Sequence, residues 1–259
     1  MNPLFPFRRG VLPGALVALG ALSGCGGDLV SESVDLAGLA DRTLTYALND
    51  VDVFEGATPV GAHRFTVLFS LAEGERCTQL REGVTATLNG MGMRLEAGGV
   101  NDTAGRDVCE PTRAFFDFDP NVWSDDGVQD ARIELRDAGH AVTLVLRGGK
   151  AKRQFEFLGP GSAARLTRGQ TYTYLWQPDE ETPGNLSATL LREGGSVTAN
   201  LPITQDGPRL TFTVPANSGL ADHLLTLSGS AAGEVTECTG VAACQGSVFH
   251  SEQGVVTLQ

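Results

Sequence analysis

The chain has 259 residues, of which 41% are hydrophobic and 19% charged, and its formal net charge is −12 at pH 7. This length and apolar content suit one or two globular domains with cores of their own. An acidic surface repels phosphate backbones, so the charge excludes nucleic acid as a partner. The 33 glycines, the low aromatic content of 7% and the lack of helical heptads favour a β-rich, turn-rich protein.

The first 24 residues have the order of an export signal. Arg8 and Arg9 form a short positive region, and an apolar run of about 12 residues (11–22) follows it. This run is too short for a spanning helix, which needs about 20 residues, and Pro13 and Gly14 weaken it further. We therefore expect a signal peptide over residues 1–24, and not a transmembrane anchor.

The signal ends in a four-residue motif, Leu22, Ser23, Gly24 and Cys25. An aliphatic residue, two small residues and a cysteine in this order resemble the lipobox of bacterial lipoproteins. The resemblance implies cleavage before Cys25, a diacylglyceryl thioether on its thiol and acylation of its freed amine. Two or three such chains hold a protein on a membrane stably. Gly26, where an aspartate would signal inner-membrane retention, implies the outer membrane. The alternative is an ordinary signal peptide with an incidental cysteine.

Four cysteines remain once Cys25 is set aside, and export places them in an oxidising compartment. Among the three possible pairings we expect Cys77–Cys109 and Cys238–Cys244, because each pair then lies within one predicted domain. In the chain-entropy model the larger loop contributes roughly 3–4 kcal/mol and the smaller roughly 2 kcal/mol. Two alternatives are a zinc site, for which Cys238 and Cys244 lack a second ligand pair at the usual spacing, and free buried thiols.

Period-2 alternation of apolar and polar residues recurs along the rest of the chain and predicts short strands. After a flexible tether over residues 25–40, turn residues separate the strands and a break at 148–150 divides them into two groups. We expect two antiparallel β-sandwich domains in tandem, at 41–150 and 151–259. The predicted strands are residues 43–48, 63–70, 84–89, 114–118, 131–137, 141–147, 153–158, 171–176, 186–191, 209–214, 223–228, 247–250 and 254–258.

The second half carries a weak resemblance to the immunoglobulin- and fibronectin-type modules of bacterial envelope proteins. It rests on the turn at Gly169, the alternating strand that ends at Trp176, and the strand at 210–214 before Pro215. Neither half has the Cys–Trp–Cys spacing of an antibody domain. The resemblance implies a β-sandwich with an immunoglobulin-like fold and no enzymatic activity.

The sequence lacks the motifs of common enzymes. It has no G-x-S-x-G elbow, no S-x-x-K, no H-E-x-x-H and no phosphate-binding G-x-x-x-x-G-K. The four histidines are scattered, and we interpret His63, His140, His223 and His250 as structural. Trp123 and Trp176 could stack on sugars, but we expect Trp176 in the core and Trp123 packed in a loop.

One loop resembles the start of a calcium-binding loop. Carboxylates and an amide alternate there and are followed by a further carboxylate at the ninth position. The candidate ligands are Asp117, Asp119, Asn121 and Asp125. Valines replace the glycine and the bidentate glutamate that such loops need, and no helix flanks the loop. The preferred interpretation is a strand end whose acidic residues face water. We therefore expect no cofactor, and calcium is the one alternative.

Taken together, these features predict a non-enzymatic lipoprotein of the cell envelope. Its lipid anchor would hold it on a membrane, and its β-sandwiches would have a structural role or bind a protein or glycan partner. Two alternatives stay open: a glycan hydrolase that uses a pair of loop carboxylates, and a calcium-dependent adhesion module.

Overall fold

The computed structural model describes residues 29–54, 56–71, 76–103, 106–123, 127, 129–195 and 198–259. Leu22 to Cys25 lie outside this part of the chain, as does Asp125. The described residues form β-strands and one short 3₁₀ helix, η1 (Leu36–Leu39), which confirms the all-β prediction. Within the described ranges no helix is both long enough and apolar enough to cross a membrane.

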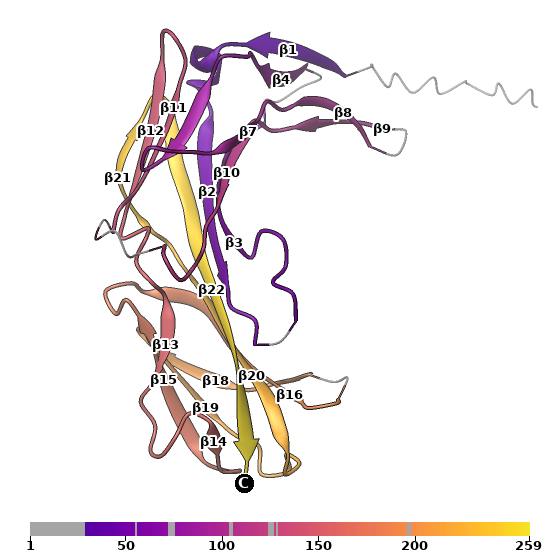
Figure 1. Ribbon diagram of the computed structural model, residues 1–259, viewed down its shortest axis with the longest axis vertical. Helices are drawn as coiled ribbons and strands as arrows, with labels where there is room; N and C mark the ends of the chain where they lie inside the picture. Colours follow the sequence, from indigo (N-terminus) through magenta and orange to yellow (C-terminus); the bar gives the residue numbers. More distant parts are fainter. Residues whose placement is uncertain are drawn as a thin grey trace, which may run out of the picture.

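A nine-stranded sheet runs along most of the molecule (Figure 1). Its order is β17-β16-β20-β22-β2-β3-β10-β7, and β14 pairs with the far end of β22. Its strands are β2 (Thr43–Val51), β3 (His63–Phe69), β7 (Arg94–Glu96), β10 (Arg113–Asp117), β14 (Arg165–Leu166), β16 (Pro183–Arg192), β17 (Thr198–Asn200), β20 (Asp222–Ala231) and β22 (Ala243–Leu258).

Two smaller sheets pack on the large one and complete two sandwiches. The upper sheet in Figure 1 has the order β21-β12-β11-β5-β6, and the lower has the order β13-β15-β19-β18. The upper strands are β5 (Thr85–Leu88), β6 (Met91–Gly92), β11 (Ala131–Arg136), β12 (Ala141–Arg147) and β21 (Glu234–Thr239). The lower strands are β13 (Gln154–Phe157), β15 (Thr171–Gln177), β18 (Ile203–Asp206) and β19 (Arg209–Thr213).

The alternation in the sequence places the core. In β2 the residues Leu44, Tyr46 and Leu48 are buried while their neighbours are half-buried, because successive side chains of a strand point to opposite faces. In β15 the same period buries Tyr174 and Trp176, as predicted for Trp176. The buried side chains of both sandwiches belong to one continuous hydrophobic cluster.

The strand β22 is shared by the two sandwiches. Its first nine residues pair in parallel with β2, and residues 248–257 pair in antiparallel fashion with β20. The two strands predicted at 247–250 and 254–258 are therefore one strand of 16 residues. The strand β21 pairs with β12 of the upper sheet. The strand β21 and the first nine residues of β22 were predicted to belong to the domain 151–259, but they complete the upper sandwich. The boundary predicted at residue 150 is therefore not a boundary between the sheets.

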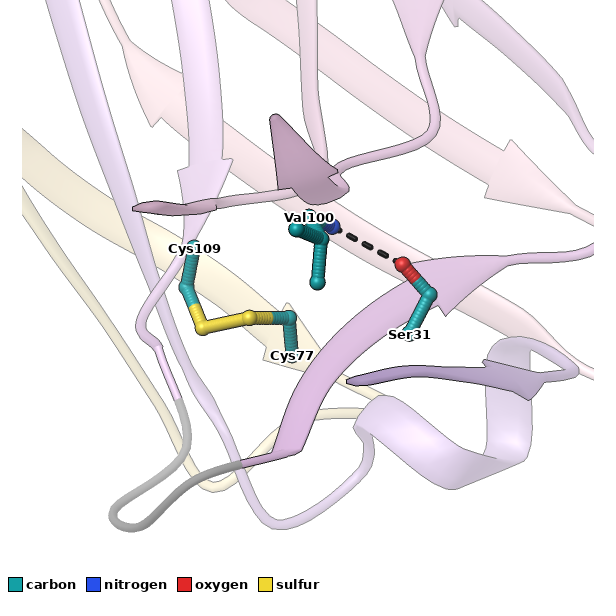
Figure 2. The surroundings of a disulfide bond; sticks show 4 residues. All are labelled: Ser31, Cys77, Val100 and Cys109. Atoms are coloured by element: carbon teal, nitrogen blue, oxygen red, sulfur yellow. Dashed lines mark hydrogen bonds between the residues drawn. A yellow bond between two sulfur atoms is a disulfide. The ribbon is translucent and has the colours of Figure 1, made fainter. Parts of the chain in front are cut away.

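The segment predicted as a flexible tether contains regular structure over residues 30–39. The strand β1 (Val30–Val34) pairs in parallel with β4 (Arg76–Leu80), and Ser31 Oγ accepts a hydrogen bond from the backbone N–H of Val100 at 2.8 Å (Figure 2). In the helix η1, Leu36 and Leu39 are buried. The tether prediction for 25–40 is therefore wrong for residues 30–39, because their backbone groups and leucines have partners in the fold.

Both predicted disulfides are formed. The disulfide Cys77–Cys109 joins β4 to β9 (Arg106–Glu110), and the Cα atoms of the two cysteines lie 5.1 Å apart (Figure 2). The strand β9 pairs in antiparallel fashion with β8 (Gly99–Thr103). Cys238–Cys244 joins β21 of the upper sheet to the start of β22 in the large sheet, with Cα atoms 5.9 Å apart. The second bond therefore links the two facing sheets of the upper sandwich.

Candidate functional site

Polar side chains stand at inward-facing positions where the two sandwiches meet. Asp50 follows three buried residues on one face of β2, and His250 follows Val248 on the inward face of β22. Asp50 and His250 are direct partners in the β2–β22 register. His63 opens β3 opposite Asp50. The sheet pairing therefore brings together three residues that are far apart in the sequence.

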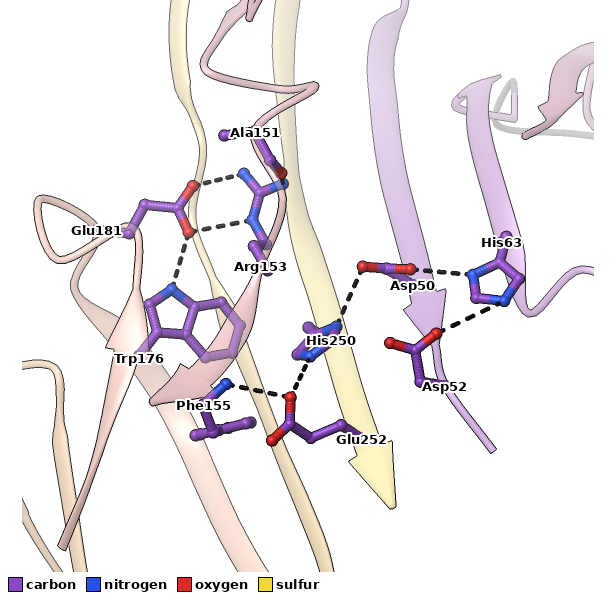
Figure 3. Close-up of polar contacts among 10 residues, drawn as sticks. All are labelled: Asp50, Asp52, His63, Ala151, Arg153, Phe155, Trp176, Glu181, His250 and Glu252. Atoms are coloured by element: carbon purple, nitrogen blue, oxygen red, sulfur yellow. Dashed lines mark hydrogen bonds and ion pairs between the residues drawn. The ribbon is translucent and has the colours of Figure 1, made fainter. Parts of the chain in front are cut away.

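The carboxylate of Asp50 lies between two imidazoles (Figure 3). Its Oδ1 is 2.9 Å from Nδ1 of His63, and its Oδ2 is 3.1 Å from Nδ1 of His250. The His250 side chain has no exposed surface, and its Nε2 lies 3.3 Å from Oε2 of Glu252. Each nitrogen of the buried ring thus faces a carboxylate oxygen.

These contacts favour a positively charged His250. Burial alone lowers the pKa of the imidazole, but the hydrogen bonds and charges of Asp50 and Glu252 outweigh it and raise the pKa to about 9. For Asp50, burial raises the pKa, and the hydrogen bonds and charges of His250 and His63 outweigh it, so the pKa is lowered. The arrangement is a buried ion pair that is charged at neutral pH.

Asp52 is the exposed member of the group. Half of its side chain is open to solvent, and its Oδ1 lies 3.9 Å from Nε2 of His63. Burial and the nearby charge of Asp50 raise its pKa. Asp50, Asp52 and His63 can bring one ligand atom each to within 4.8 Å of one another, which is the spacing of a cation site. A cation there would compete with the Asp50–His63 hydrogen bond.

A second buried ion pair lies beside the first (Figure 3). Arg153, in the connection between the sandwiches, is 2% exposed. Its Nε donates to Oε2 of Glu181 at 3.1 Å and its Nη2 donates to Oε1 of the same carboxylate. Its Nη1 donates to the carbonyl oxygen of Ala151 at 3.1 Å, and Nε1 of Trp176 donates to Oε2 of Glu181 at 3.0 Å. This bidentate geometry fixes the connecting segment to the lower sandwich.

Aromatic rings join the two ion pairs. The ring centroid of His250 lies 6.0 Å from that of Phe155 and 6.1 Å from that of Trp176. The backbone N–H of Phe155 donates to Oε2 of Glu252 at 3.1 Å. The junction network, as we call Asp50, His63, Arg153, Trp176, Glu181, His250 and Glu252, therefore extends from β3 to β15.

The raised pKa of His250 means that the protein loses stability at alkaline pH. The pKa of His250 is about 9 in the folded state, and the ordinary pKa of an imidazole is 6.5. The stabilisation by the charged imidazole is therefore complete below pH 6.5 and is lost as pH rises through 9. We expect the free energy of unfolding to fall by about 2–3 kcal/mol between pH 7 and pH 10. Urea unfolding at several pH values measures this change.

Two variants separate the contribution of His250 from general alkaline effects. His250→Gln is expected to flatten the decline, whereas His140→Gln, which changes an exposed turn residue, is expected to retain it. An NMR titration of the imidazole signals of the wild-type protein checks the pKa directly. A His250 signal that titrates near 6.5 would contradict the assignment of a buried imidazolium.

The loop considered for calcium is arranged differently from a metal site. Both oxygens of Asp117 accept hydrogen bonds from Arg64, at 2.6 Å and 2.8 Å, and this contact lowers the pKa of Asp117. Oδ1 of Asp119 accepts from the backbone and side-chain amides of Asn121. Calcium would have to displace Arg64, so the geometry favours the interpretation of a solvent-facing strand end.

The remaining aromatic and histidine predictions concern packing. Trp123 is 7% exposed and stacks on Phe118 with ring centroids 4.2 Å apart, in agreement with loop packing. His223 is buried, with Nδ1 3.0 Å from the carbonyl oxygen of Ala221. The interpretation of four scattered histidines missed the pairing of His63 and His250 around Asp50. Part of the signal was present, because His63 and His250 lie at the ends of predicted strands, whereas Asp50 lies beyond the strand predicted at 43–48.

Comparisons with known proteins add little to this description. No protein-family model and no curated protein matches the sequence. A chimeric titin Z1Z2 that carries a KLER peptide from decorin is 11% identical, with a TM-score of 0.23 over 85% of this chain and 98% of that one. A titin immunoglobulin tandem is 8% identical, with a TM-score of 0.22 over 85% and 93%. A tetra-tandem repeat from the extending region of a large adhesion protein is 14% identical, with a TM-score of 0.21 over 83% and 49%. Such low TM-scores support no functional argument.

Proposed function

We propose that the protein is a lipoprotein of the cell envelope that acts as a rigid, non-catalytic structural or binding module. Cys25 would carry the lipid and hold the chain on a membrane, with the outer membrane as the expected destination. The exposed faces of the sandwiches would bind a protein or glycan partner. The observation that carries the proposal is the strand β22, which passes through both sandwiches and makes them one elongated body (Figure 1).

The positions of the chain ends support a module that stands away from its anchor. The strand β1, which is the described strand nearest to Cys25 in the sequence, lies at the upper end of the molecule, whereas β22 ends at the lower end (Figure 1). A lipid at Cys25 would therefore place the upper sandwich near the bilayer. The lower sandwich would then extend away from the membrane.

The junction network supports the rigidity of this body. Two ion pairs, together with the rings of Phe155 and Trp176, fill the junction, where two independently hinged domains would have a solvated linker. Buried ion pairs fix geometry more than they add stability, since each charge needs its partner in place. The sandwiches are therefore expected to move together and not about a hinge.

A non-catalytic role is supported by the state of the junction carboxylates. Both oxygens of Asp50 are occupied by imidazoles, and Glu181 is bound by Arg153 and Trp176. A hydrolase with two carboxylates needs one free acid and one free base that face a bound glycan. Among the carboxylates at the junction, Asp52 is the most accessible, and a single exposed carboxylate does not make such a pair.

Replacement of Cys25 tests the anchor. We expect the wild-type protein to incorporate labelled palmitate and to partition into the detergent phase on cloud-point extraction. Cys25→Ser should take up no label and partition into the aqueous phase, because no thioether can form. Ser23→Ala is the matched control, since it retains a small residue before the cleavage site and should behave as wild type. A wild-type protein found unlabelled in the aqueous phase would contradict the proposal.

A further inference from the structure

The strand β22 has an interrupted edge in the lower sandwich. On one side it pairs with β20 along residues 248–257. On the other side it pairs with β2 as far as Ser251, and with β14 from Thr257 onwards. Among the described strands, residues 252–256 therefore have a neighbour on one side only. A strand rises about 3.3 Å per residue, so the interruption is long enough for roughly five residues of another strand.

The flanking hydrogen bonds show which backbone groups point into this interruption. The N–H of Asp52 donates to the carbonyl of Ser251 at 2.8 Å, and the N–H of Thr257 donates to the carbonyl of Ala164 at 2.9 Å. Odd-numbered residues of β22 thus direct their backbone groups to the side of β2 and β14, and even-numbered residues direct theirs to β20.

By this alternation, the N–H and C=O groups of Gln253 and Val255 point into the interruption. Within the part of the chain that the structure describes, no backbone partner is found for these four groups on that side. Unpaired donors and acceptors along a strand edge are a ready template for an added strand.

The sheet is hollowed on both faces beside these residues. The inner hollow has a volume of about 240 Å³ and the outer about 430 Å³. The larger apolar side chains on the inner face of this hollow are Phe155, Phe157, Tyr174, Leu225, Leu227 and Val256. The apolar lining of the outer hollow is Phe54, Leu191, Leu224 and Val255. Alternate side chains of an added strand would point into one hollow and then the other.

Gly254 keeps the inner hollow open. It lies within a central strand, where glycine normally weakens pairing, and its φ is not in the left-handed region. A Cβ atom built on it would meet no atom within 4 Å. The glycine is therefore required neither by the backbone nor by crowding, and its effect is to leave space beside the edge.

The charges around the interruption are mainly acidic. Asp52 follows the last paired residue of β2. Glu252 also lines the inner hollow, but its carboxylate is paired with His250 and adds no free charge. Glu193 and Asp222 line the outer hollow, where Arg192 is the cation among the described lining residues. An occupant with basic residues beside its apolar ones would be favoured by this potential.

We propose that the interrupted edge of β22 binds an extended segment of a partner protein by strand addition. The segment has about four consecutive apolar residues, which fill the two hollows in turn, and a lysine or arginine at each end. Its backbone pairs with Gln253 and Val255. The inference deepens the binding role proposed above, but it uses no lipid, so its failure would leave the anchor proposal untouched.

The test uses the full chain with Cys25→Ser and the synthetic peptide KVLVLK. We expect saturable binding by calorimetry, together with slowed amide hydrogen exchange at Gln253 and Val255. Gly254→Val should weaken binding at least tenfold, because its side chain would occupy the inner hollow, where a Cβ atom on residue 254 meets nothing within 4 Å. Gly254→Ala is the milder variant if the valine variant fails to fold, and it should weaken binding by a smaller factor.

Two control peptides identify the mode of binding. A fully N-methylated KVLVLK lacks the donors for strand pairing, and EVLVLE reverses the charges; each should bind at least tenfold more weakly. Binding that is equal for all three peptides, or that leaves exchange at Gln253 and Val255 unchanged, would overturn the proposal. A concentration-dependent dimer that Gly254→Val abolishes would also overturn it, because it would assign the edge to a second copy of the chain.

Discussion

Arg153→Met is expected to lower the free energy of unfolding by about 3 kcal/mol. The substitution removes a side chain that is 2% exposed and leaves the carboxylate of Glu181, whose side chain is 15% exposed, with the indole of Trp176 as its remaining partner. A buried carboxylate without its cation has lost its hydration and gained no compensating charge. Urea unfolding at pH 7 measures the change.

Two further variants show that the effect comes from the unpaired charge. In the double variant Arg153→Met/Glu181→Gln, residue 181 carries no charge and its amide oxygen can still accept a hydrogen bond from Trp176. We therefore expect at least about 1 kcal/mol of the lost free energy of unfolding to be recovered. Arg147→Met is the surface control: its partner Glu234 is exposed, and the loss should be below about 1 kcal/mol. If Arg153→Met and Arg147→Met lowered the free energy of unfolding by the same amount, burial of the Arg153–Glu181 pair would not be the cause of the effect.

Gly246→Ala is expected to destabilise the protein by about 3 kcal/mol or more. A Cβ atom at this position would meet the backbone carbonyl oxygen of Tyr46, which is its partner in the β2–β22 register. Because the clash is with backbone and not with a flexible side chain, β2 and β22 would have to separate locally. Thermal unfolding followed by circular dichroism measures the effect.

The same strand supplies a matched control. Gly254→Ala is the same chemical change, but its Cβ would meet no atom within 4 Å. Replacing glycine at an unstrained position reduces the entropy of the unfolded chain, so this variant should be unchanged or more stable by up to about 1 kcal/mol. If both variants lost the same stability, the close approach at Gly246 would not be the cause.

Local patterns in the sequence were sufficient to predict most of the strands. Period-2 alternation predicted β2, β3, β12 and β15 because each buries one face in a sandwich. Short edge strands such as β17 and β18 were missed, since their exposed positions carry no apolar alternation. The disulfide pairs followed from the even number of cysteines and their grouping along the chain.

Partnerships between distant segments could not be predicted in this way. The sequence around Ser251 and Glu252 contains no apolar residue, so it resembled a turn between two strands, whereas pairing with β2 and β20 makes it the middle of β22. Asp50 lies at an inward position of β2, but the strand extends to Val51 and was predicted only as far as residue 48. Its partners His63 and His250 depend on strand register, which is set only when the sheet forms.

The shared strand also determines how the molecule would respond to mechanical load. β2 and β22 run in the same direction, and their nine residue pairs extend from Thr43 opposite Ala243 to Val51 opposite Ser251. A pull between a membrane-held N-terminal end and a load at the end of β22 draws the two strands past each other lengthwise. All nine pairs then resist in shear at once instead of opening one after another. In such a chain the tension passes from one sandwich to the other through continuous backbone, without a linker that could extend first.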